Sequence, residues 1–150
     1  MICDQAAGSS RRDVRTMPLR ITLKAHERLI INGACIRNGD RNADLLVETQ
    51  CKFLRETEII RESEADTPCK KLCVTLQVVY LADDPSKAID LFTMQAAEVM
   101  QIMPSAALFL AEISRHITAQ QYHHAIKAGR KLIAHEQEWL EDRYRSTNAA

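Results

Sequence analysis

The segment from Leu19 to Arg41 reads LRITLKAHERLIINGACIRNGDR, and its pattern decides the fold of the first part of the chain. Apolar and polar residues alternate from Leu19 to Ala25, which is the period of a half-buried β-strand. A second apolar run covers Leu29 to Asn32, and Asn32-Gly33 is a strong hairpin signal because both residues tolerate positive φ. Extended structure is therefore predicted to resume from Ala34 to Arg37.

Further short strands are predicted after this hairpin. Asn38-Gly39-Asp40 repeats the turn chemistry, and apolar runs follow over Asp44 to Glu48 and Cys51 to Arg55. Ile59-Ile60 predicts the end of another strand. Together these runs give about four to six short antiparallel strands, which need a helix or a partner chain to cover their apolar face.

The same segment is rich in basic residues. Five Lys/Arg stand there against two acidic residues, so one face of the predicted sheet carries a modest positive charge. Those basic residues are Arg20, Lys24, Arg28, Arg37 and Arg41. The predicted strands hold a single aromatic residue, Phe53, which we expect in the core, so they offer little platform for base stacking.

The second half of the chain has helical periodicity. Thr67-Pro68 predicts a helix start, with threonine as the N-cap and proline at the first helical position. The β-branched residues at 74–79 also suit a strand, but the apolar spacing favours a helix. Three more helices are predicted at 86–103, at 105–116, and from a cap at Thr118 to near Arg143. Inward positions are expected in the first of these at Ile89, Phe92, Ala96, Val99, Met100 and Met103, and in the last at Tyr122, Ile126, Gly129, Ile133 and Leu140.

These elements predict an α+β fold, in which a small N-terminal antiparallel β-sheet or partly closed barrel precedes a C-terminal helical hairpin or bundle. A chain of 150 residues with 46% hydrophobic content can bury such a core. The predicted regions are a disordered extension at 1–16, a β-rich region at 17–61, a helical region at 62–144 and a tail at 145–150. The extension is either an arginine-bearing arm or a stretch that precedes a translation start at Met17, and we favour the second interpretation.

The charge distribution limits the kinds of ligand. The formal net charge is zero and the sequence pI is about 7.0, which argues against a protein that coats nucleic acid by bulk electrostatics. Residues 19–61 carry eight Lys/Arg and six Asp/Glu, whereas residues 62–104 carry three and seven. An anionic ligand is therefore expected to bind locally, in the strand region or on the last helix.

Catalytic and metal-binding patterns are missing from the sequence. Phosphate-cradling and dinucleotide-binding glycine motifs, nucleophile elbows and HExxH are absent, so we expect no enzyme and no cofactor. The odd number of cysteines, the lack of a secretory signal and the lack of a membrane-spanning run predict reduced thiols in the cytoplasm. Cys69 and Cys73 share a helix face without further ligands nearby, and Cys35 and Cys51 are expected to be small buried residues. The histidines of the last helices are expected to be solvated or capping.

Several of these motifs together resemble one protein family. Lys24 with Glu27-Arg28, followed by Asn32-Gly33-Ala34 and Asn38-Gly39-Asp40-Arg41, resembles the N-terminal signature of the FlbT family, bacterial regulators of flagellin synthesis. The resemblance continues through Phe53-Leu54-Arg55, Pro68, Gln77 and Tyr80, from Met17 to about Trp139. It implies a cytoplasmic protein that associates with the 5′ untranslated leader of flagellin mRNA and alters the degradation or translation of that message. The effect differs among relatives, and we expect repression here.

The resemblance directs the RNA hypothesis to the strand region. Arginine suits this task because its planar fork pairs with phosphate and also stacks on bases. The predicted RNA-binding residues are Arg20, Lys24, Arg28, Arg37, Arg41, Lys52 and Arg55. Residues 24–33 also resemble the carbon storage regulator proteins, small β-rich dimers that clamp messenger leaders. That second resemblance implies RNA contact along edge strands and a homodimer.

An alternative hypothesis is a protein-interaction adaptor. Its helices would bind flagellin or the companion regulator FlaF, and control of the RNA would then be indirect. The candidate contact residues are Met94, Met100, Met103, Phe109 and Trp139. The near-zero net charge favours the adaptor, whereas the clustered strand arginines favour RNA binding.

Overall fold

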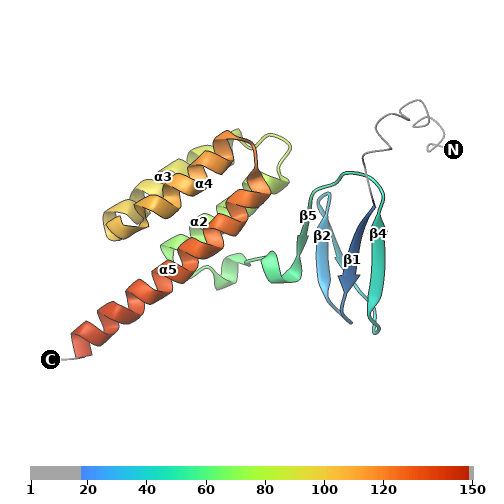
Figure 1. The fold of residues 1–150 in the computed structure, drawn as a ribbon, viewed down its shortest axis with the longest axis horizontal. Helices are drawn as coiled ribbons and strands as arrows, with labels where there is room; N and C mark the ends of the chain where they lie inside the picture. The colour runs from blue at the N-terminus through green and yellow to red at the C-terminus, as the bar shows by residue number, and fades with distance from the viewer. Residues whose placement is uncertain (1–17, 149–150) are drawn as a thin grey trace. The chain divides into compact units, whose positions relative to one another are not determined.

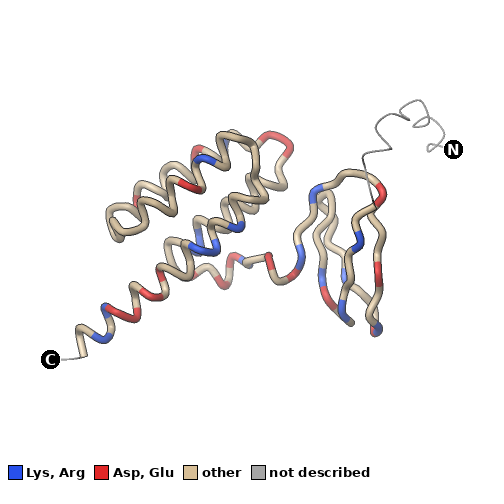
Figure 2. Tube along the Cα trace, viewed as in Figure 1, with Lys and Arg blue, Asp and Glu red and all other residues tan. Residues whose placement is uncertain are grey.

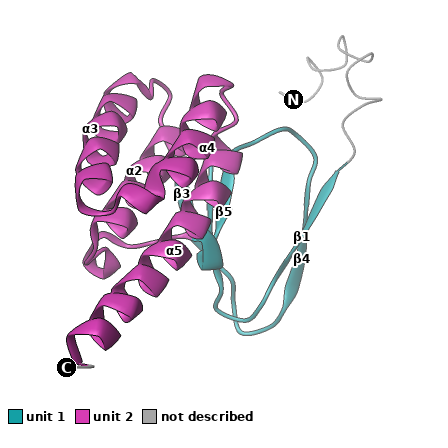
Figure 3. Ribbon diagram, turned by 60° about the vertical axis from the view of Figure 1, so that its left-hand side comes forward, with its two compact units in different colours: residues 1–58 teal, residues 59–150 magenta. Residues whose placement is uncertain are grey.

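The structure, a computed structural model, describes residues 18–148 and divides the chain into two compact units (Figures 1 and 3). Residues 1–58 belong to a β unit and residues 59–150 to a helical unit, and each is described by itself. The predicted N-terminal extension, with its arginines and the alternative start at Met17, lies outside the described residues. Strands precede helices along the chain, which confirms the α+β fold.

The β unit contains five short antiparallel strands in two sheets. One sheet pairs β1 with β4, and the other has the order β3-β2-β5. The strands are β1 (Leu19–Leu23), β2 (Arg28–Ile31), β3 (Ala34–Arg37), β4 (Ala43–Val47) and β5 (Phe53–Arg55). The predicted hairpin is confirmed, because Ile31 pairs with Ala34 across Asn32 (φ 48°) and Gly33 (φ 84°). Positive φ at both turn residues matches the right-handed twist of the strands.

The apolar faces of the two sheets supply the core of the β unit. Ile21 and Leu23 of β1 form a buried cluster with Leu29 of β2. Partly buried hydrophobic residues of β2, β4 and β5 pack against this cluster, namely Ile31, Leu45, Val47 and Phe53. The strands are thus divided between two sheets that share one apolar cluster, and the predicted cover by a helix or a partner chain stays a prediction.

Two expectations about the strands were wrong. Ile59-Ile60 forms no strand, because the short 3-10 helix η2 (Glu56–Glu58) ends the extended chain and the side-chain amide of Gln77 binds both backbone groups of Ile60. Cys35 is exposed, since β3 is an edge strand whose residues are all exposed. Cys51 is only half-buried and lies before β5 rather than on a strand.

The helical unit begins as the sequence predicted. Thr67 caps α2 (Pro68–Leu81) by accepting a hydrogen bond from the Lys70 N–H, and Pro68 occupies the first helical position. A 3-10 turn, η3 (Glu62–Glu64), precedes this cap. The remaining elements are α3 (Ser86–Ile102), the 3-10 turn η4 (Pro104–Ala106), α4 (Ala107–Thr118) and α5 (Tyr122–Asn148).

Close packing of α5 on α2 sets the core of the helical unit. A Cβ added at Gly129 would lie 2.8 Å from Cys73 Sγ and 3.0 Å from Leu76 Cδ1, so glycine is needed for this approach. The buried positions of α5 are Ala125, Ile126, Ala128, Gly129, Leu132 and Glu136. Small residues therefore move the contact stripe away from the predicted Tyr122, Ile133 and Leu140, and Leu140 is 44% exposed.

Other helical details also differ from expectation. Thr118 does not cap α5. It is the last residue of α4, where its hydroxyl donates to the Ser114 carbonyl, and the positive φ of Gln120 (58°) reverses the chain. Met100 is exposed, whereas Met103 is buried as predicted. The last helix continues to Asn148, beyond the end that we expected near Arg143.

Candidate nucleic-acid interface

Two side chains fasten one end of the β unit by binding backbone groups. Glu27 is 9% exposed, and its Oε1 accepts a hydrogen bond from the Lys24 N–H at 2.8 Å. The Asn38 Nδ2 donates to the backbone oxygens of Lys24 at 2.8 Å and of Arg41 at 2.7 Å. The Asn38 N–H donates to the Glu27 carbonyl at 2.9 Å. The turn after β1 is thereby joined to the loop before β4.

This arrangement gathers most of the predicted RNA-binding residues. Arg28 and Arg37 lie directly opposite each other in the β2–β3 pair. Lys24 and Arg41 are brought together by the amide just described, and Arg55 ends β5 beside the beginning of β2. These five residues, Lys24, Arg28, Arg37, Arg41 and Arg55, are called the basic end below.

The basic end contains an electrostatic conflict. Like charges directly opposite each other on paired strands repel, and such a cross-strand term is on the order of 0.2–1 kcal/mol. Among residues 18–148, neither Arg28 nor Arg37 has an acidic partner, and the same is true of Lys24 and Arg41. An anion bound between these side chains would remove the repulsion.

Arg55 has a mixed role at the basic end. Its guanidinium donates to the Thr22 carbonyl at 2.5 Å and lies 3.9 Å from Glu27 Oε2. The side chain is 36% exposed, so part of it remains accessible. Arg55 therefore links β5 to β1 and presents only part of its charge to a ligand.

The other two predicted residues lie elsewhere. The side chain of Arg20 donates to Asp44 on the exposed face of β1 and β4. That hydrogen bond lowers the pKa of Asp44, which also accepts from the Thr22 hydroxyl at 2.8 Å, and it raises the pKa of Arg20. Lys52 lies at the opposite end of the β unit, where its backbone exchanges two hydrogen bonds with Asn32. Neither residue belongs to the basic end.

A hollow of about 730 Å³ opens beside the basic end of the β unit. Its charged and polar lining includes Lys24, Arg55, Glu27 and Glu56. His26 also lines it, with the positive φ of 65° that the turn requires. Sequence reasoning missed His26, although it stands between Lys24 and Glu27 in the quoted motif. A nucleotide in this hollow would meet the cations of Lys24 and Arg55, which attract a phosphate, and the carboxylates of Glu27 and Glu56, which repel it but can accept hydrogen bonds from a base edge.

The surface charge of the β unit is mixed. Figure 2 shows Lys and Arg interspersed with Asp and Glu along the strands rather than joined into a continuous basic band. Phe53 is only partly buried but packs against the core cluster, as expected, and it is the one Phe, Tyr or Trp among residues 18–58. Binding here would depend on a few phosphate contacts and on arginine stacking.

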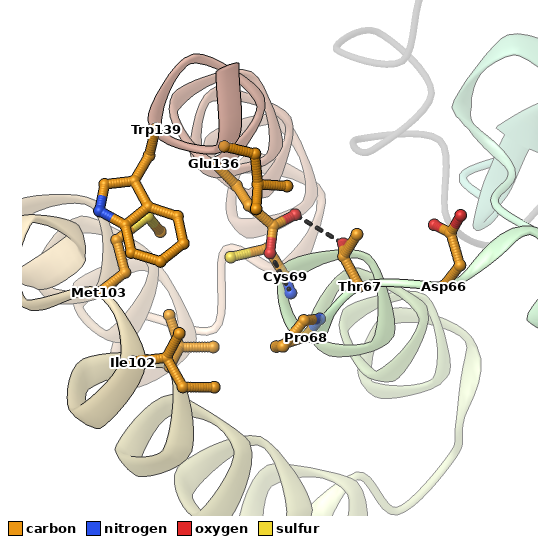
Figure 4. A pocket seen from close by; sticks show the side chains of 10 residues that line it. Asp66, Thr67, Pro68, Cys69, Ile102, Met103, Glu136 and Trp139 are labelled. Atoms are coloured by element: carbon orange, nitrogen blue, oxygen red, sulfur yellow. Dashed lines mark hydrogen bonds between the residues drawn. The ribbon is translucent and has the colours of Figure 1, made fainter. Parts of the chain in front are cut away.

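A second polar arrangement lies in the helical unit, and sequence reasoning missed it. Glu136 of α5 is 6% exposed and lies at the N-terminus of α2, where it accepts from the Thr67 hydroxyl at 2.6 Å and from the Cys69 N–H at 3.2 Å (Figure 4). Helix N-termini favour negative charge, so this carboxylate completes the cap. The signal in the sequence is a glutamate four residues after Leu132 on the buried stripe of α5.

The buried carboxylate also affects two thiols. Burial, reinforced by the charge of Glu136, raises the pKa of Cys69, and the same causes raise the pKa of Cys73 to about 12. The Cys73 thiol donates to the Gly129 carbonyl at 3.3 Å. Both groups are therefore protonated and structural at neutral pH. No group of three or more metal-ligating side chains is found among residues 18–148.

Histidines connect helices that are neighbours in the unit. The rings of His116 and His124 stack with centroids 5.6 Å apart, and His135 stacks on Phe109 at 4.7 Å. His135 Nε2 lies 2.8 Å from the Ser105 hydroxyl oxygen. These rings have specific packing partners, which the solvated or capping interpretation did not anticipate.

Comparison with known proteins decides the family. The family described as "Flagellar protein FlbT" matches residues 19–140, which include the basic end and Glu136. The chain belongs to the FlbT family. A protein of Caulobacter sp. (strain K31) named "Probable flagellum biosynthesis repressor protein FlbT" is 31% identical over 127 residues, which cover 83% of this chain and 97% of that protein.

Other FlbT relatives match a similar share of this chain with similar identity. The "Flagellum biosynthesis repressor protein FlbT" of Caulobacter vibrioides (strain ATCC 19089) is 31% identical over 83% of this chain and 90% of its own length. A probable FlbT repressor of Rhodopseudomonas palustris (strain TIE-1) is 32% identical over 83% of this chain and 98% of its own length. No solved structure matches this FlbT-family chain. Within residues 18–148, no helix has both the length and the apolar character needed to cross a membrane.

Proposed function

We propose that this protein represses flagellum biosynthesis after transcription, by binding the 5′ untranslated leader of flagellin mRNA through the basic end and altering the degradation or translation of that message. The FlbT relatives are named as repressors of flagellum biosynthesis, which supports the regulatory role. Their names describe regulators rather than enzymes. Contact with a messenger would take place in the cytoplasm.

The observation that carries the proposal is the unpaired arginine pair on β2 and β3. Arg28 and Arg37 face the same side of one strand pair, and neither has an ion pair among residues 18–148. Lys24 and Arg41 are held nearby by the Asn38 amide, so the four cations occupy one end of a small unit. Phosphate groups from consecutive nucleotides supply the negative charges that such a cluster lacks.

A charge-reversal pair tests the proposal. Arg28→Glu with Arg41→Glu should weaken binding of the full chain to leader RNA by about 100-fold or more, since each phosphate contact contributes a salt-dependent share. The fold should survive, because a glutamate at position 28 would face Arg37 favourably.

The matched control reverses two charges in the helical unit. Lys87 and Lys127 are exposed and have no ion pair among the described residues, so Lys87→Glu with Lys127→Glu changes the net charge equally. This control should retain nearly full RNA affinity. Equal losses in both double variants would indicate bulk electrostatics, and unchanged affinity in a folded Arg28/Arg41 variant would contradict the proposed site.

The adaptor hypothesis is supported by a different observation. Leu91 and Met94 are one turn apart on α3 and are 47% and 64% exposed, and Leu108 on α4 is 84% exposed. Such side chains suit a protein partner, here FlaF or flagellin. Of the residues first assigned to this role, Met103 is buried, so Met94 and Met100 are better placed to reach a partner. If the adaptor is correct, Leu91→Ser with Met94→Ser should abolish both regulation and the binding of FlaF or flagellin, whereas Arg28→Glu with Arg41→Glu should leave regulation intact.

A further inference from the structure

The C-terminal end of α5 is an unpartnered helical segment. Residues 141–148 are helical and all of them are exposed. In two views this end of α5 extends past the other helices of its unit (Figures 1 and 3). Tyr144 is 72% exposed and lies one turn after Leu140, which is 44% exposed. A short isolated helix is marginal in water, so an exposed apolar stripe on such a segment suits a contact with another helix.

An apolar cavity lies where this segment leaves the bundle. The cavity has a volume of about 250 Å³, and its apolar lining includes Ile102, Met103, Trp139 and Leu140 (Figure 4). Ile102 is 51% exposed, which places it at the mouth. Pockets for drug-sized molecules begin at roughly 300 Å³, whereas this cavity suits a single bulky side chain.

We propose that a second copy of this chain fills the cavity. The two α5 helices cross antiparallel near Asp142, and Tyr144 of each copy enters the cavity of the other. In this register Tyr144 faces Leu140 of the second copy, and Arg143 faces Glu141. Because cavity and tyrosine are on the same helix, a single two-fold axis forms both contacts at once. Tyrosine suits such a place, since its ring is buried while its hydroxyl stays near water.

Charge complementarity favours a second copy over an anionic partner. Arg143, next to Tyr144, has no ion pair among residues 18–148, whereas Arg145 already pairs with Glu141 and Asp142. The cavity lining carries two carboxylates, Glu136 and Asp66, of which Asp66 pairs with Lys70. The guanidinium of Arg143 lies over the Trp139 ring, 4.7 Å from its centroid, and Trp139 lines the cavity, so a positive charge lies beside the cavity wall. An acidic peptide or a nucleic acid would meet like charge there. This contact is independent of RNA binding and lies on α5, rather than on the edge strands suggested by the carbon storage regulators.

Sedimentation velocity of the full chain, from about 1 to 100 μM, tests the proposal. We expect a monomer–dimer equilibrium in which Tyr144→Ala raises the dimer Kd by about 30-fold, as for a tyrosine at the centre of an interface. Tyr144 has no hydrogen-bond, ionic or ring partner among residues 18–148, so thermal unfolding of the monomer should be unchanged. Leu108→Ala is the matched control, because Leu108 is even more exposed, and its Kd should change less than about twofold.

Mixing two defective chains tests direct insertion. Ile102→Arg blocks the mouth of the cavity, so this variant and Tyr144→Ala should each dimerise poorly. A mixture retains one intact contact, with Tyr144 of the Ile102→Arg chain in the cavity of the Tyr144→Ala chain, and should associate more tightly than either variant alone. A wild-type chain that stays monomeric at 100 μM, a dimer insensitive to Tyr144→Ala, or a mixture without rescue would overturn the proposal. A protein that stays monomeric, and in which Tyr144→Ala weakens only the binding of FlaF, would also overturn the proposal.

Discussion

The β unit and the helical unit both use polar side chains to tie backbone segments together, but they differ in the charge left at the surface. In the β unit, Glu27 and Asn38 join the turn after β1 to the loop before β4, and Lys24, Arg28, Arg37 and Arg41 at that end have no acidic partner among residues 18–148. In the helical unit, Glu136 and Gln77 are buried and bind backbone groups of Cys69 and Ile60, and surface cations such as Lys70, Lys131 and Arg145 have acidic partners. The difference indicates that ligand-directed charge belongs to the β unit, whereas the polar groups of the helical unit stabilise it.

Removing the Glu136 carboxylate should affect stability most. Glu136→Ala leaves the Thr67 hydroxyl and the Cys69 N–H without their acceptor, which should cost about 3 kcal/mol in the free energy of unfolding. Amide hydrogen exchange should show the loss in the helical unit only. The control is Glu138→Ala, an exposed position two residues later, expected within about 0.5 kcal/mol of wild type. Equal effects of the two substitutions would contradict a structural role for Glu136.

Removing the Asn38 amide should affect the β unit alone. Asn38→Ala loses hydrogen bonds to Lys24, Arg41 and Gly39, and we expect a loss of about 2 kcal/mol. RNA affinity should fall as well, although no charge is removed, because Lys24 and Arg41 would separate. Asn42→Ala, which loses a single bond to the Ala25 N–H, should have a smaller effect on both readouts. Full RNA affinity in Asn38→Ala would show that the positions of these cations are unimportant.

Alkaline pH should weaken the helical unit through its buried thiols. Burial raises the pKa of Cys73 to about 12 in the folded protein, so the unfolded chain loses its thiol proton first, near pH 8.5. Stability should therefore be complete below that pH and fall above it, by up to about 1.4 kcal/mol per pH unit and thiol. Urea unfolding between pH 8 and 10, followed by Trp139 fluorescence, should show a shallower fall in Cys73→Ala. An identical slope in the variant would contradict this cause.

The close approach of α5 to α2 predicts the smallest change. Gly129→Ala gains helix propensity of about 1 kcal/mol but overpacks the core by roughly 1–3 kcal/mol, so a net loss near 1 kcal/mol is expected. The added Cβ would meet Cys73 Sγ at 2.8 Å. Combining it with Cys73→Ala should recover stability relative to the sum of the single changes, as measured by urea unfolding. Additive effects would show that the two sites do not touch.

Local signals explain what could be predicted from the sequence. The alternation at Leu19 to Leu23, the Asn32-Gly33 turn and the Thr67-Pro68 start each depend on a few neighbouring residues, and the structure contains all three. The basic residues were also identified individually. Their gathering was not predictable, because it depends on strand register and on the contacts of the Asn38 side chain with Lys24 and Arg41.

The remaining differences arise from long-range packing. Cys35 suited a buried strand position, but whether a strand lies at an edge depends on pairing order. Glu136 suited the exposed side of a charged helix, and its burial requires the N-terminus of α2, 67 residues earlier, as a partner. Arg20 looked equivalent to Arg28 until the β1–β4 pairing placed Asp44 beside it.

Direct binding of leader RNA is the central claim, and its salt dependence is the most direct test. Purified full-length protein should be titrated with flagellin leader RNA and a scrambled control at several salt concentrations, with and without FlaF. We predict leader-selective binding by the protein alone. Each phosphate contact should raise log Kd by about 0.7 for each unit of log salt concentration. Three or four contacts at the basic end should therefore raise log Kd by about 2–3 for each tenfold increase in salt. Selective binding that appears only after FlaF or flagellin is added would contradict the account and favour an adaptor that acts through its helices.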